Sequence, residues 1–413
     1  MIREGSFNRD VCVIGGGGHV GLPLAITFAQ TGLKTVIYDI NPKVVESIRS
    51  GIMPFIEEGG QEALGEVIKS GKLEAYSTPE HVIDCRFVVL IVGTPVDEHL
   101  NPNFIAIHKA LELCLPNLRS GQILILRSTV FPGITRHIQN FLANHGLDIA
   151  VSFCPERAVQ GYSLREFREN PQMISATDAK TLAEVRQLFS GFVTDFIEMD
   201  PMEAELAKLM TNAWRYIQFA TVNQFFMIAT QHGLDFNRIL KGCRDKYPRM
   251  AGMPGPGFAA GPCLVKDTMQ LAAFSQNNFV LGHAAMLINE GLPLHVVQMA
   301  KQMTDISRMT AGILGMAFKA ESDDHRDSLA YKLRKLLTLE TKKVICTDPY
   351  VKDKSFLPQD QVLKEADILF VSTPHKAYRG LKIPAAKYVV DVWNCVDASQ
   401  ARTWQAEHQA HRR

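Results

Sequence analysis

The stretch VCVIGGGGHVG at residues 11–21 decides the fold. An apolar run leads into a cluster of glycines, a helical pattern then extends from Gly21 to about Thr31, and a second apolar run, KTVIYDI, follows. A strand, a helix and a second strand in this order form a βαβ unit, the building block of parallel sheets. We therefore expect the first part of the chain to be a doubly wound α/β domain.

The glycine cluster has the spacing of a turn that binds a dinucleotide. Read as G-x-G-x-x-G, it lets the backbone approach a pyrophosphate closely, and the helix N-terminus that follows supplies positive charge. A glycine-rich turn without a ligand is the structural alternative. The second apolar run carries an acid about 20 residues past the first glycines, which would accept the ribose hydroxyls and repel a 2′-phosphate. The pattern predicts NAD rather than NADP as the cofactor, bound by Gly16, Gly18, His19, Val20, Gly21 and Asp39.

The composition limits the classes of function. The chain has 413 residues, of which 46% are hydrophobic and 21% charged, and its net charge is +1. This balance argues against binding to nucleic acid or a membrane surface, although a local basic pocket can still bind phosphate. No run of 18 apolar residues occurs, the start lacks a signal-peptide pattern, and the eight cysteines form no C-x-x-C pair. We expect a cytoplasmic protein with reduced thiols, no metal site, and neither nucleic acid nor membrane as a partner.

The rest of the chain alternates strands and helices around a helical middle. The apolar runs FVVLIVGTP, ILILRSTV and DIAVSF come first, and AGILGMAF, KKVICTDP, ADILFVSTP and YVVDVW fill the last third. Between them, DPME at residues 200–203 is typical of a helix start, and the helix continues to about Gly233. We predict an N-terminal Rossmann domain (1–198), a central helical dimerisation domain (199–300) and a second Rossmann-like domain (301–413). The polar tail RTWQAEHQAHRR is expected to be a solvated end.

Two sequence patterns of the first part of the chain recur in its last third. YDINP at 38–42 resembles CTDP at 346–349, and the run ending in GTP at Pro95 resembles the one ending in STP at Pro374. The second domain's first turn, in GILGMAF, lacks the G-x-G-x-x-G spacing. We therefore expect the second Rossmann-like domain to hold a different ligand.

The loop PGPGFAAGPCLVKD at residues 254–267 carries the strongest candidate nucleophile. Cys263 is followed three and four residues later by Lys266 and Asp267. If a helix begins near the cysteine, its N-terminus and a nearby ammonium both favour a thiolate. The structural alternative is a buried cysteine in a loop.

The long central helix carries a polar stripe on an otherwise apolar surface. Lys208, Asn212 and Arg215 stand at i, i+4 and i+7, so they share one face. A solvated face is one interpretation, and a face turned to a cleft fits the apolar neighbours better. Glu156 and Thr129 follow apolar runs, where loop side chains often serve chemistry. A surface acid and a helix cap, respectively, are the alternatives.

These motifs together resemble the UDP-glucose/GDP-mannose dehydrogenase family over nearly the whole chain. The cysteine loop is similar to the family's glycine-rich run ending in C-x-x-K-D. Other landmarks recur in order: GTP at 93–95, STVFPG at 128–133, CPERAVQG at 154–161, KLMTN at 208–212 and GMAFKAESDDHRDS at 315–328. The resemblance implies two Rossmann-like domains joined by a central helical domain, and an NAD-dependent 6-dehydrogenase that oxidises a nucleotide sugar twice.

The resemblance also implies a mechanism. An aldehyde can give up a second hydride only after something adds to it, and a cysteine thiolate suits this addition. Lys208, or a water held by Asp267, would take the alcohol proton, and Cys263 would form a thiohemiacetal and then a thioester. Lys208 and Asn212 would stabilise the oxyanion, and Glu156 would act as general base for the hydrolytic water. Thr129 at its strand end could hold a water.

The remaining site residues follow from the resemblance as well. Thr94, Pro95, Thr129 and Arg326 are expected near the cofactor. The expected substrate contacts are Glu156, Arg157, Lys208, Asn212, Arg215, Arg249, Gly257, Lys266, Phe318 and Lys319. Cations suit a phosphate-bearing ligand, although any one of them could be a plain surface charge. Arg249 matches a family arginine that reaches the neighbouring subunit's site, which implies a homodimer.

The substrate is narrowed by the form P-E-R-x-x-x-G at 155–161, which resembles the branch acting on UDP-N-acetylhexosamines. UDP-GlcNAc or UDP-ManNAc is therefore expected, with UDP-glucose as the runner-up. The loop before the cysteine departs from the family, because Ala259-Ala260-Gly261-Pro262 stands where paired glycines are usual. A one-step hydroxyacid dehydrogenase or a non-catalytic nucleotide-sugar binding protein are the rival classes.

Overall fold

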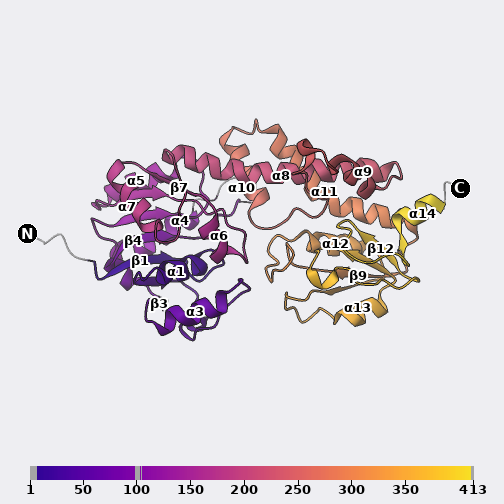
Figure 1. Cartoon of the computed structure of the whole chain (residues 1–413), viewed down its shortest axis with the longest axis horizontal. Coiled ribbons are helices and arrows are strands. Elements are labelled where there is room, and N and C mark those ends of the chain that lie inside the picture. Colours follow the sequence, from indigo (N-terminus) through magenta and orange to yellow (C-terminus); the bar gives the residue numbers. More distant parts are fainter. Residues whose placement is uncertain (1–6, 98–102, 104, 411–413) are drawn as a thin grey trace, which may run out of the picture. The chain divides into compact units, whose positions relative to one another are not determined.

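The chain folds into two compact units. The computed structural model describes residues 7–97, 103 and 105–410, and its units are Met1–Thr211 and Asn212–Arg413. The boundary falls inside the long helix α8 (Pro201–Gln231). Both units are α/β and each has its own sheet (Figure 1).

The first unit is built on an eight-stranded sheet of order β3-β2-β1-β4-β5-β6-β7-β8. The strands are β1 (Arg9–Ile14), β2 (Thr35–Tyr38), β3 (Leu73–Tyr76), β4 (Cys85–Leu90), β5 (Ile123–Leu126), β6 (Ala150–Phe153), β7 (Gln172–Ala176) and β8 (Phe196–Glu198). The helices are α1 (Gly21–Gln30), α2 (Pro42–Arg49), α3 (Gly60–Lys69), α4 (Ile105–Cys114), α5 (Ile134–Asn144), α6 (Ser163–Glu169) and α7 (Ala179–Phe189). The order 3-2-1-4-5-6 is that of a dinucleotide-binding Rossmann domain, so the predicted fold is confirmed. One pair, β6 with β7, is antiparallel, which the apolar runs did not predict.

Apolar side chains cover both faces of this sheet. On β1, Val11 and Val13 belong to one apolar cluster, whereas Cys12 and Ile14 belong to another. Side chains alternate across a strand, so the two clusters lie on opposite faces. A sheet buried on both faces reads in the sequence as continuous apolar runs, which is the reason that β1, β4 and β5 were recognisable.

Helix α8 begins and ends where its sequence signals predict. The Asp200 backbone N–H donates to the Glu203 carboxylate at 3.0 Å, a contact typical of a helix start. The helix ends at Gln231, and Gly233 has the positive φ of 68° that suits the residue after a helix.

The second unit carries a five-stranded parallel sheet of order β10-β9-β11-β12-β13. Its strands are β9 (Thr310–Leu314), β10 (Lys343–Thr347), β11 (Ile368–Val371), β12 (Tyr388–Asp391) and β13 (Arg402–Thr403). Its helices are α9 (Phe236–Arg244), α10 (Leu264–Phe274), α11 (Val280–Met303), α12 (Leu329–Glu340), α13 (Gln359–Glu365) and α14 (Trp404–Ala410). The second Rossmann-like fold is therefore confirmed, whereas the three-part division of the chain stays a prediction.

The first residues of the C-terminal tail, 402–404, join the fold of the second unit, so the prediction of a solvated end was wrong for them. Arg402 and Thr403 form strand β13 beside β12, and Trp404 is only 2% exposed. The Trp404 indole N–H donates to the Gln302 side chain at 3.3 Å. Burying a large aromatic side chain stabilises the fold. Residues 411–413 lie outside the described residues.

Helix α11 is long and apolar enough to cross a membrane by length and composition, although the sequence has no unbroken run of 18 apolar residues. Its apolar character has a local explanation. Leu292, Val296 and Ala300 recur every four residues and belong to the apolar core of the second unit. Within the described residues this is the only helix that meets those criteria.

Candidate active site

The turn after β1 is shaped by glycines that no other residue can replace. A Cβ on Gly15 would lie 1.9 Å from the Ile91 carbonyl oxygen, and one on Gly21 would lie 2.6 Å from the Gly15 carbonyl oxygen. Gly18, by contrast, is exposed and has open space beside it. The crowded glycines fold the turn tightly while Gly18 leaves its backbone accessible, which is the shape that a pyrophosphate requires.

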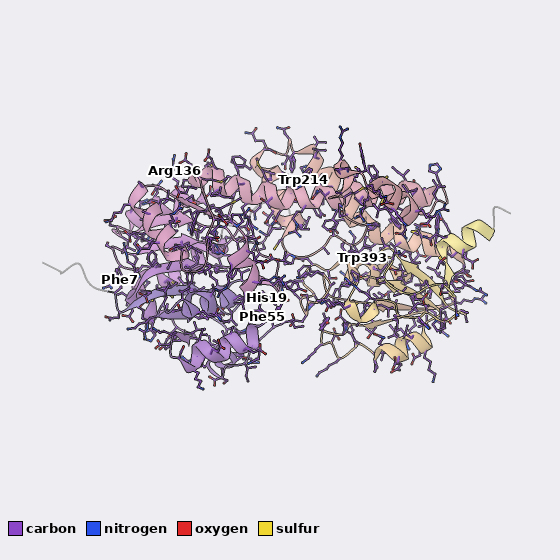
Figure 2. All side chains as sticks on the ribbon, viewed as in Figure 1. Phe7, His19, Phe55, Arg136, Trp214 and Trp393 are labelled. Atoms are coloured by element: carbon purple, nitrogen blue, oxygen red, sulfur yellow. The ribbon has the colours of Figure 1, made fainter. Side chains whose placement is uncertain are left out.

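His19 and Val20 complete this turn. Both are partly exposed, and the His19 ring packs on Phe55 with centroids 4.1 Å apart (Figure 2). Val20 immediately precedes helix α1, so the turn leads directly to a helix N-terminus. Gly15, whose φ is 73°, was not among the predicted cofactor residues. Its signal was present, because a fourth glycine extends the motif by one residue.

Asp39 follows β2 and faces the same turn. Its carboxylate accepts from the Gly17 N–H at 2.8 Å and from the Asn41 N–H at 2.9 Å. A carboxylate oxygen has lone pairs beyond those two bonds, and Asp39 is only partly buried. The residues present therefore fit a dinucleotide whose ribose hydroxyls bind Asp39.

Replacing Asp39 by asparagine should weaken NAD binding and relax the choice of cofactor. Losing a charged hydrogen-bond acceptor typically costs about 10- to 100-fold in affinity, and the repulsion of a 2′-phosphate disappears with the charge. The ratio of kcat/KM for NAD to that for NADP measures both effects. Asp10→Asn, at the exposed start of the same sheet, is the matched control. An unchanged ratio would exclude Asp39 from cofactor choice.

Two further strand ends of the first sheet meet near this turn. The Thr94 hydroxyl, after β4, donates to the Thr129 carbonyl oxygen, after β5, at 2.7 Å. The neighbouring Ser128 hydroxyl bonds to both the N–H and the carbonyl of Val92. Thr94 is buried, and Pro95 beside it is exposed. Carboxyl ends of parallel strands share one edge, which is where doubly wound sheets bind ligands.

Glu156, after β6, is held in one orientation by a buried arginine. The Arg127 guanidinium, whose side chain is 1% exposed, forms an ion pair with one Glu156 oxygen. The other oxygen accepts from the backbone N–H groups of Arg157 and Ala158 at 2.6 and 2.5 Å. The Arg157 side chain turns away and donates to the Pro171 carbonyl. Arg127 was not among the predicted site residues, although a lone arginine at the end of the apolar run ILILR was a visible signal.

The polar stripe on α8 divides into buried and exposed members. Lys208 and Asn212 are 9% and 6% exposed, whereas Arg215 is exposed. The Asn212 amide donates to the carboxylate of Asp267 at 2.5 Å, and Asp267 is fully buried. The other Asp267 oxygen forms an ion pair with Lys266. In the second unit, the structure thus brings three of the predicted residues together as one polar cluster.

Cys263 is the residue from which α10 starts. It immediately precedes the helix, and its carbonyl accepts the Asp267 N–H at 2.9 Å. It is the one exposed cysteine of the eight, all of which lie in the described part of the chain. Burial raises the pKa of the Cys114 thiol to about 12 and that of Cys154 to about 11, so these cysteines are poor nucleophiles. The alternative of a buried structural cysteine therefore does not hold for Cys263.

The loop before Cys263 is fixed at its first part by Asn223. This fully buried amide accepts the Gly257 N–H at 2.9 Å and donates to the Gly257 carbonyl at 3.0 Å. A Cβ on Gly257 would lie 2.3 Å from the ring of Trp393, which follows β12. Ala259 packs with Tyr216 in a small apolar cluster. The unusual alanine of the loop is therefore a packing residue.

The end of the loop rests on the segment after β9, residues 315–328. The Gly261 N–H donates to the Asp327 carbonyl at 3.2 Å, and Gly261 lies against the Phe318 ring. Lys319 beside Phe318 is partly exposed. The Arg326 guanidinium binds Asp324, which raises the pKa of Arg326, and Cys263 is among the groups that raise it further. Arg326 thus supplies positive charge within electrostatic range of the sulfur.

A basic cavity of about 750 Å³ adjoins this loop and was not predicted. Its walls come from α9, from the start of the cysteine loop and from the turn after β12. The lining residues include Arg238, Lys241, Arg244, Lys246, Asp245, Gly255, Pro256, Trp393 and Asn394. Four cations face one carboxylate, and an indole lies beside them. The cluster NRILKGCRDK in the sequence was a signal for it that we did not use.

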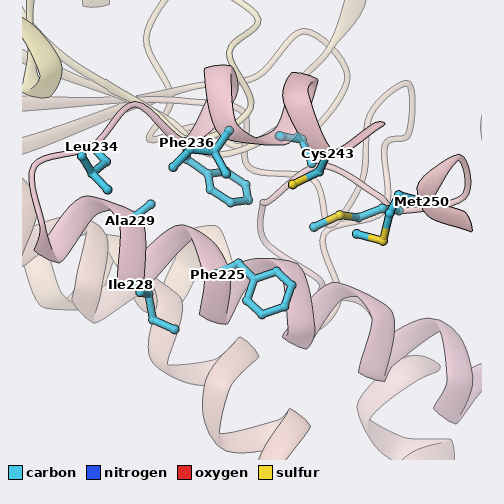
Figure 3. A pocket seen from close by; sticks show the side chains of 10 residues that line it. Phe225, Ile228, Ala229, Leu234, Phe236, Cys243 and Met250 are labelled. Atoms are coloured by element: carbon cyan, nitrogen blue, oxygen red, sulfur yellow. The ribbon is translucent and has the colours of Figure 1, made fainter. Parts of the chain in front are cut away.

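A second cavity, of about 280 Å³, is apolar throughout. Phe225 and Ile228 of α8 face Phe236 and Cys243 of α9 across it (Figure 3). It lacks the acids and cations that chemistry on a nucleotide sugar requires. No group of three or more metal-ligating side chains occurs in the described ranges. Arg249 is exposed and lies in the short turn Pro248–Met250 that follows α9.

Comparison with known proteins identifies the family of this chain. Three models of the UDP-glucose/GDP-mannose dehydrogenase family match consecutive parts of the chain: the NAD binding domain at 9–193, the central domain at 202–290 and the UDP binding domain at 312–398. A UDP-N-acetyl-D-mannosamine dehydrogenase of Methanocaldococcus jannaschii is 30% identical over 385 residues, covering 92% of this chain and 88% of that relative. The chain belongs to the UDP-glucose/GDP-mannose dehydrogenase family.

Solved structures of the UDP-glucose/GDP-mannose dehydrogenase family share this architecture. The UDP-D-ManNAc dehydrogenase of Pyrococcus horikoshii has a TM-score of 0.89 and 27% identity, over 97% of this chain and 100% of that one. A UDP-glucose dehydrogenase of Pyrobaculum islandicum also has a TM-score of 0.89, with 26% identity over 98% of each chain. The protein is an NAD-dependent oxidoreductase of this family with a UDP binding domain.

Proposed function

We propose that this protein oxidises the C6 alcohol of a UDP-N-acetylhexosamine to the carboxylate in two steps. The observation that carries the proposal is the exposed thiol of Cys263 at the start of α10, close in sequence to the polar cluster of Lys266, Asp267 and Asn212. A single oxidation to the aldehyde needs no nucleophile. An exposed thiol near an acid and a base is useful when the aldehyde must be oxidised again.

The side chains divide the chemistry between them. When bound, NAD⁺ supplies the acceptor for the hydride in each oxidation. Lys208, or a water held by Asp267, takes the proton of the C6 hydroxyl. The Cys263 sulfur then adds to the aldehyde carbon, and oxidation of the resulting thiohemiacetal leaves a thioester. Asn212 and Lys208 stabilise the negative charge that develops on the oxygen.

Hydrolysis of the thioester requires an oriented water, and we assign its orientation to Glu156. Arg127 and two backbone N–H groups hold this carboxylate in place and occupy part of its accepting capacity. The Glu156 carboxylate still has a lone pair that can accept a hydrogen bond from a water. Thr129, at the neighbouring strand end, is the second proposed contact of that water. Glu156 is therefore proposed as a general base that is fixed before substrate binds.

The substrate class is supported by three observations. The basic cavity beside Trp393 suits a nucleoside diphosphate, because cations attract the phosphates and an indole can stack on a base. The segment CPERAVQG is similar to that of the N-acetylhexosamine branch. Relatives named UDP-N-acetyl-D-mannosamine dehydrogenase match over most of the chain. UDP-ManNAc or UDP-GlcNAc is the proposed substrate, and UDP-glucose is the second candidate because a UDP-glucose dehydrogenase shares the fold.

Removing two cations of the basic cavity should weaken substrate binding without impairing chemistry. Lys241→Gln combined with Lys246→Gln is expected to raise KM for the UDP-sugar about tenfold at low salt, and less at high salt because the charges are exposed. The turnover number at saturation should change little. Lys301→Gln, which removes an exposed cation paired with Glu340 on α11, is the control. An unchanged KM at low salt would remove this cavity from the substrate site.

A homodimer is proposed from the exposed apolar side chains of α8. Trp214 (Figure 2), Met210, Phe225 and Ile228 are 61%, 53%, 43% and 47% exposed, which is unusual for large apolar residues along one helix. A second copy of the chain would cover them and would bring its Arg249 toward this site. We further propose a cytoplasmic enzyme that uses neither a membrane nor nucleic acid as a partner.

Counting NADH tests the function directly. A panel of UDP-GlcNAc, UDP-ManNAc, UDP-glucose and GDP-mannose is supplied with excess NAD⁺, and NADH and acid are measured at completion. Two NADH per sugar with formation of the uronic acid is the expected result for a UDP-N-acetylhexosamine. One NADH per sugar would instead identify a one-step dehydrogenase, and none with any sugar, despite binding, a non-catalytic binding protein.

A further inference from the structure

A buried histidine that has no role in the proposed chemistry contacts residues 315–328, the segment that carries the proposed substrate contacts Phe318 and Lys319. His375 follows β11 and is 0% exposed. Its Nδ1 atom lies 3.1 Å from the backbone nitrogen of Glu321, and its Nε2 atom lies 3.2 Å from Oδ2 of Asp348. A backbone N–H can only donate, so Nδ1 must accept. The neutral tautomer with the proton on Nε2 is therefore the one that satisfies both contacts.

Asp348 fixes the position of this imidazole. Its side chain is fully buried and accepts from the backbone N–H groups of Met316 and Ala317 at 2.6 and 3.0 Å. Burial alone would raise the pKa of Asp348, but the hydrogen bonds from His375 and from backbone N–H groups, among them those of Val351 and Met316, lower it below its ordinary value. Asp348 is therefore an ionised anchor that orients His375 and holds the first residues of the segment.

The other side of the imidazole holds a strained part of the segment. Glu321 has φ of 56°, in the left-handed region that residues with a side chain rarely adopt. Its carboxylate accepts from the Lys376 N–H at 2.7 Å and from the Tyr350 hydroxyl at 3.0 Å. Such a conformation persists only when its surroundings fix it. His375 and the residue after it supply two of those contacts.

The segment so held is the one on which the cysteine loop rests. Phe318 lies three residues before Glu321 and packs on Gly261, and its N–H donates to the Asp324 carbonyl at 3.0 Å. The Asp327 carbonyl accepts the Gly261 N–H. Lys319, a proposed substrate contact, stands between Phe318 and the strained residue. A shift of Glu321 would therefore move both the substrate contacts and the support of the cysteine loop.

We propose that His375 is a positioning residue, whose neutral imidazole accepts the Glu321 N–H and so holds residues 315–328 in the conformation that binds the nucleotide sugar. The inference rests on the proposed function, because it assigns substrate contacts to that segment. His375 itself does not touch the reacting atoms. Its loss should therefore raise KM for the nucleotide sugar more than it lowers kcat.

The imidazole of His375 is enclosed by charged and aromatic side chains. The charged groups around the ring are Asp348, at 3.2 Å from Nε2, the Glu321 carboxylate, at 3.9 Å from Nδ1, and Lys376, whose ammonium lies 4.0 Å from Glu321. The rings of Tyr350 and Tyr378 close the remaining sides.

Two substitutions separate the two nitrogen contacts. His375→Asn places an amide oxygen near the position of Nδ1 and keeps the acceptor for Glu321, whereas His375→Gln places its amide group near Nε2 and keeps the contact with Asp348. The asparagine variant should keep KM within about threefold of the wild type, and the glutamine and alanine variants should raise it about tenfold or more. His295→Asn, at a half-buried histidine of α11 bonded to Thr230, is the control.

The experiment measures KM, kcat and hydrogen exchange of residues 315–328 at pH 8. The proposal expects higher KM and faster exchange of the segment in His375→Gln and His375→Ala than in the wild type and His375→Asn. Equal KM and exchange for the asparagine, glutamine and alanine variants would overturn it. If the alanine variant does not fold, the comparison of the asparagine and glutamine variants decides, and equal values for these two overturn the proposal.

The readouts separate this inference from the proposed function. A wild type that yields two NADH per sugar while the His375 variants bind substrate normally would refute only the positioning role. A wild type that oxidises no nucleotide sugar would refute the function. In that case UDP binding, measured by calorimetry, replaces KM, and hydrogen exchange still tests how His375 holds the segment.

Discussion

Replacing Cys263 by alanine is expected to abolish acid formation. Without the sulfur no thiohemiacetal forms, so the second hydride has no suitable donor carbon and aldehyde-level product accumulates or stays bound. Loss of a covalent nucleophile typically lowers turnover by at least about 10⁴-fold. The measurement is the uronic acid formed, by mass spectrometry, together with the NADH released in a single turnover. At most one NADH per active site is expected from the variant.

The matched control for this prediction is Cys243→Ala. Cys243 is partly exposed and lies in the apolar cavity between α8 and α9, far in sequence from the reactive loop. Its removal should leave the yield of two NADH per sugar unchanged. Normal acid formation by the Cys263 variant would refute the covalent mechanism, whatever the control shows.

Changing Asn212 to aspartate should have the second-largest effect. The Asn212 amide now donates to the fully buried Asp267 at 2.5 Å, and the introduced carboxylate would face a like charge at that distance. Two ionised carboxylates this close in a buried position repel each other strongly. We expect kcat at pH 8 to fall by about 10³-fold, because the oxyanion donor is lost and the charge of the cluster is altered. Asn212→Ala, which loses only the donor, should cost about 10²-fold.

The pH dependence distinguishes charge repulsion in the aspartate variant from loss of the hydrogen-bond donor in the alanine variant. Lowering the pH protonates one carboxylate of the aspartate variant and relieves the repulsion, so its kcat and its thermal stability should recover partly as pH falls. The alanine variant should show no such recovery. Asn170→Asp, which sets a carboxylate near Glu166 at a partly exposed position, is the control for added charge. Identical pH profiles for the aspartate and alanine variants would contradict the buried cluster.

The sequence was sufficient for features that are local along the chain. The glycine turn, Asp39, Thr129 and Glu156 each stand directly after an apolar run, and the carboxyl ends of parallel strands necessarily share one edge. Cys263 was recognisable because the residues that support it, Lys266 and Asp267, follow within one turn of helix. In these cases the residues proposed for the site are also neighbours in sequence.

The features that were missed depend on pairs far apart along the chain. Arg127 binds Glu156 across 29 residues, and His375 binds Asp348 across 27. The Trp393 ring fills the space beside Gly257, which no spacing rule connects to it. Such pairings arise from sheet order and packing, which a single sequence does not reveal.

Exposure was the other property that periodicity could not predict. The stripe on α8 places Arg215 on the same face as Asn212, yet one is exposed and the other buried. The prediction of a solvated tail was wrong for a similar reason, because the polar composition of the tail does not reveal that Trp404 is buried. Helical spacing identifies a face of a helix, but the neighbouring elements decide how far along the helix that face is covered.

The uneven distribution of the cysteines has a practical consequence. Five of the eight are buried and only one is exposed, so a mild alkylating reagent should label the protein predominantly at a single atom. The rate of that labelling would report occupancy of the reactive loop without any turnover. Screening of candidate ligands could then proceed by protection of one sulfur, before the sugar that the enzyme oxidises has been identified.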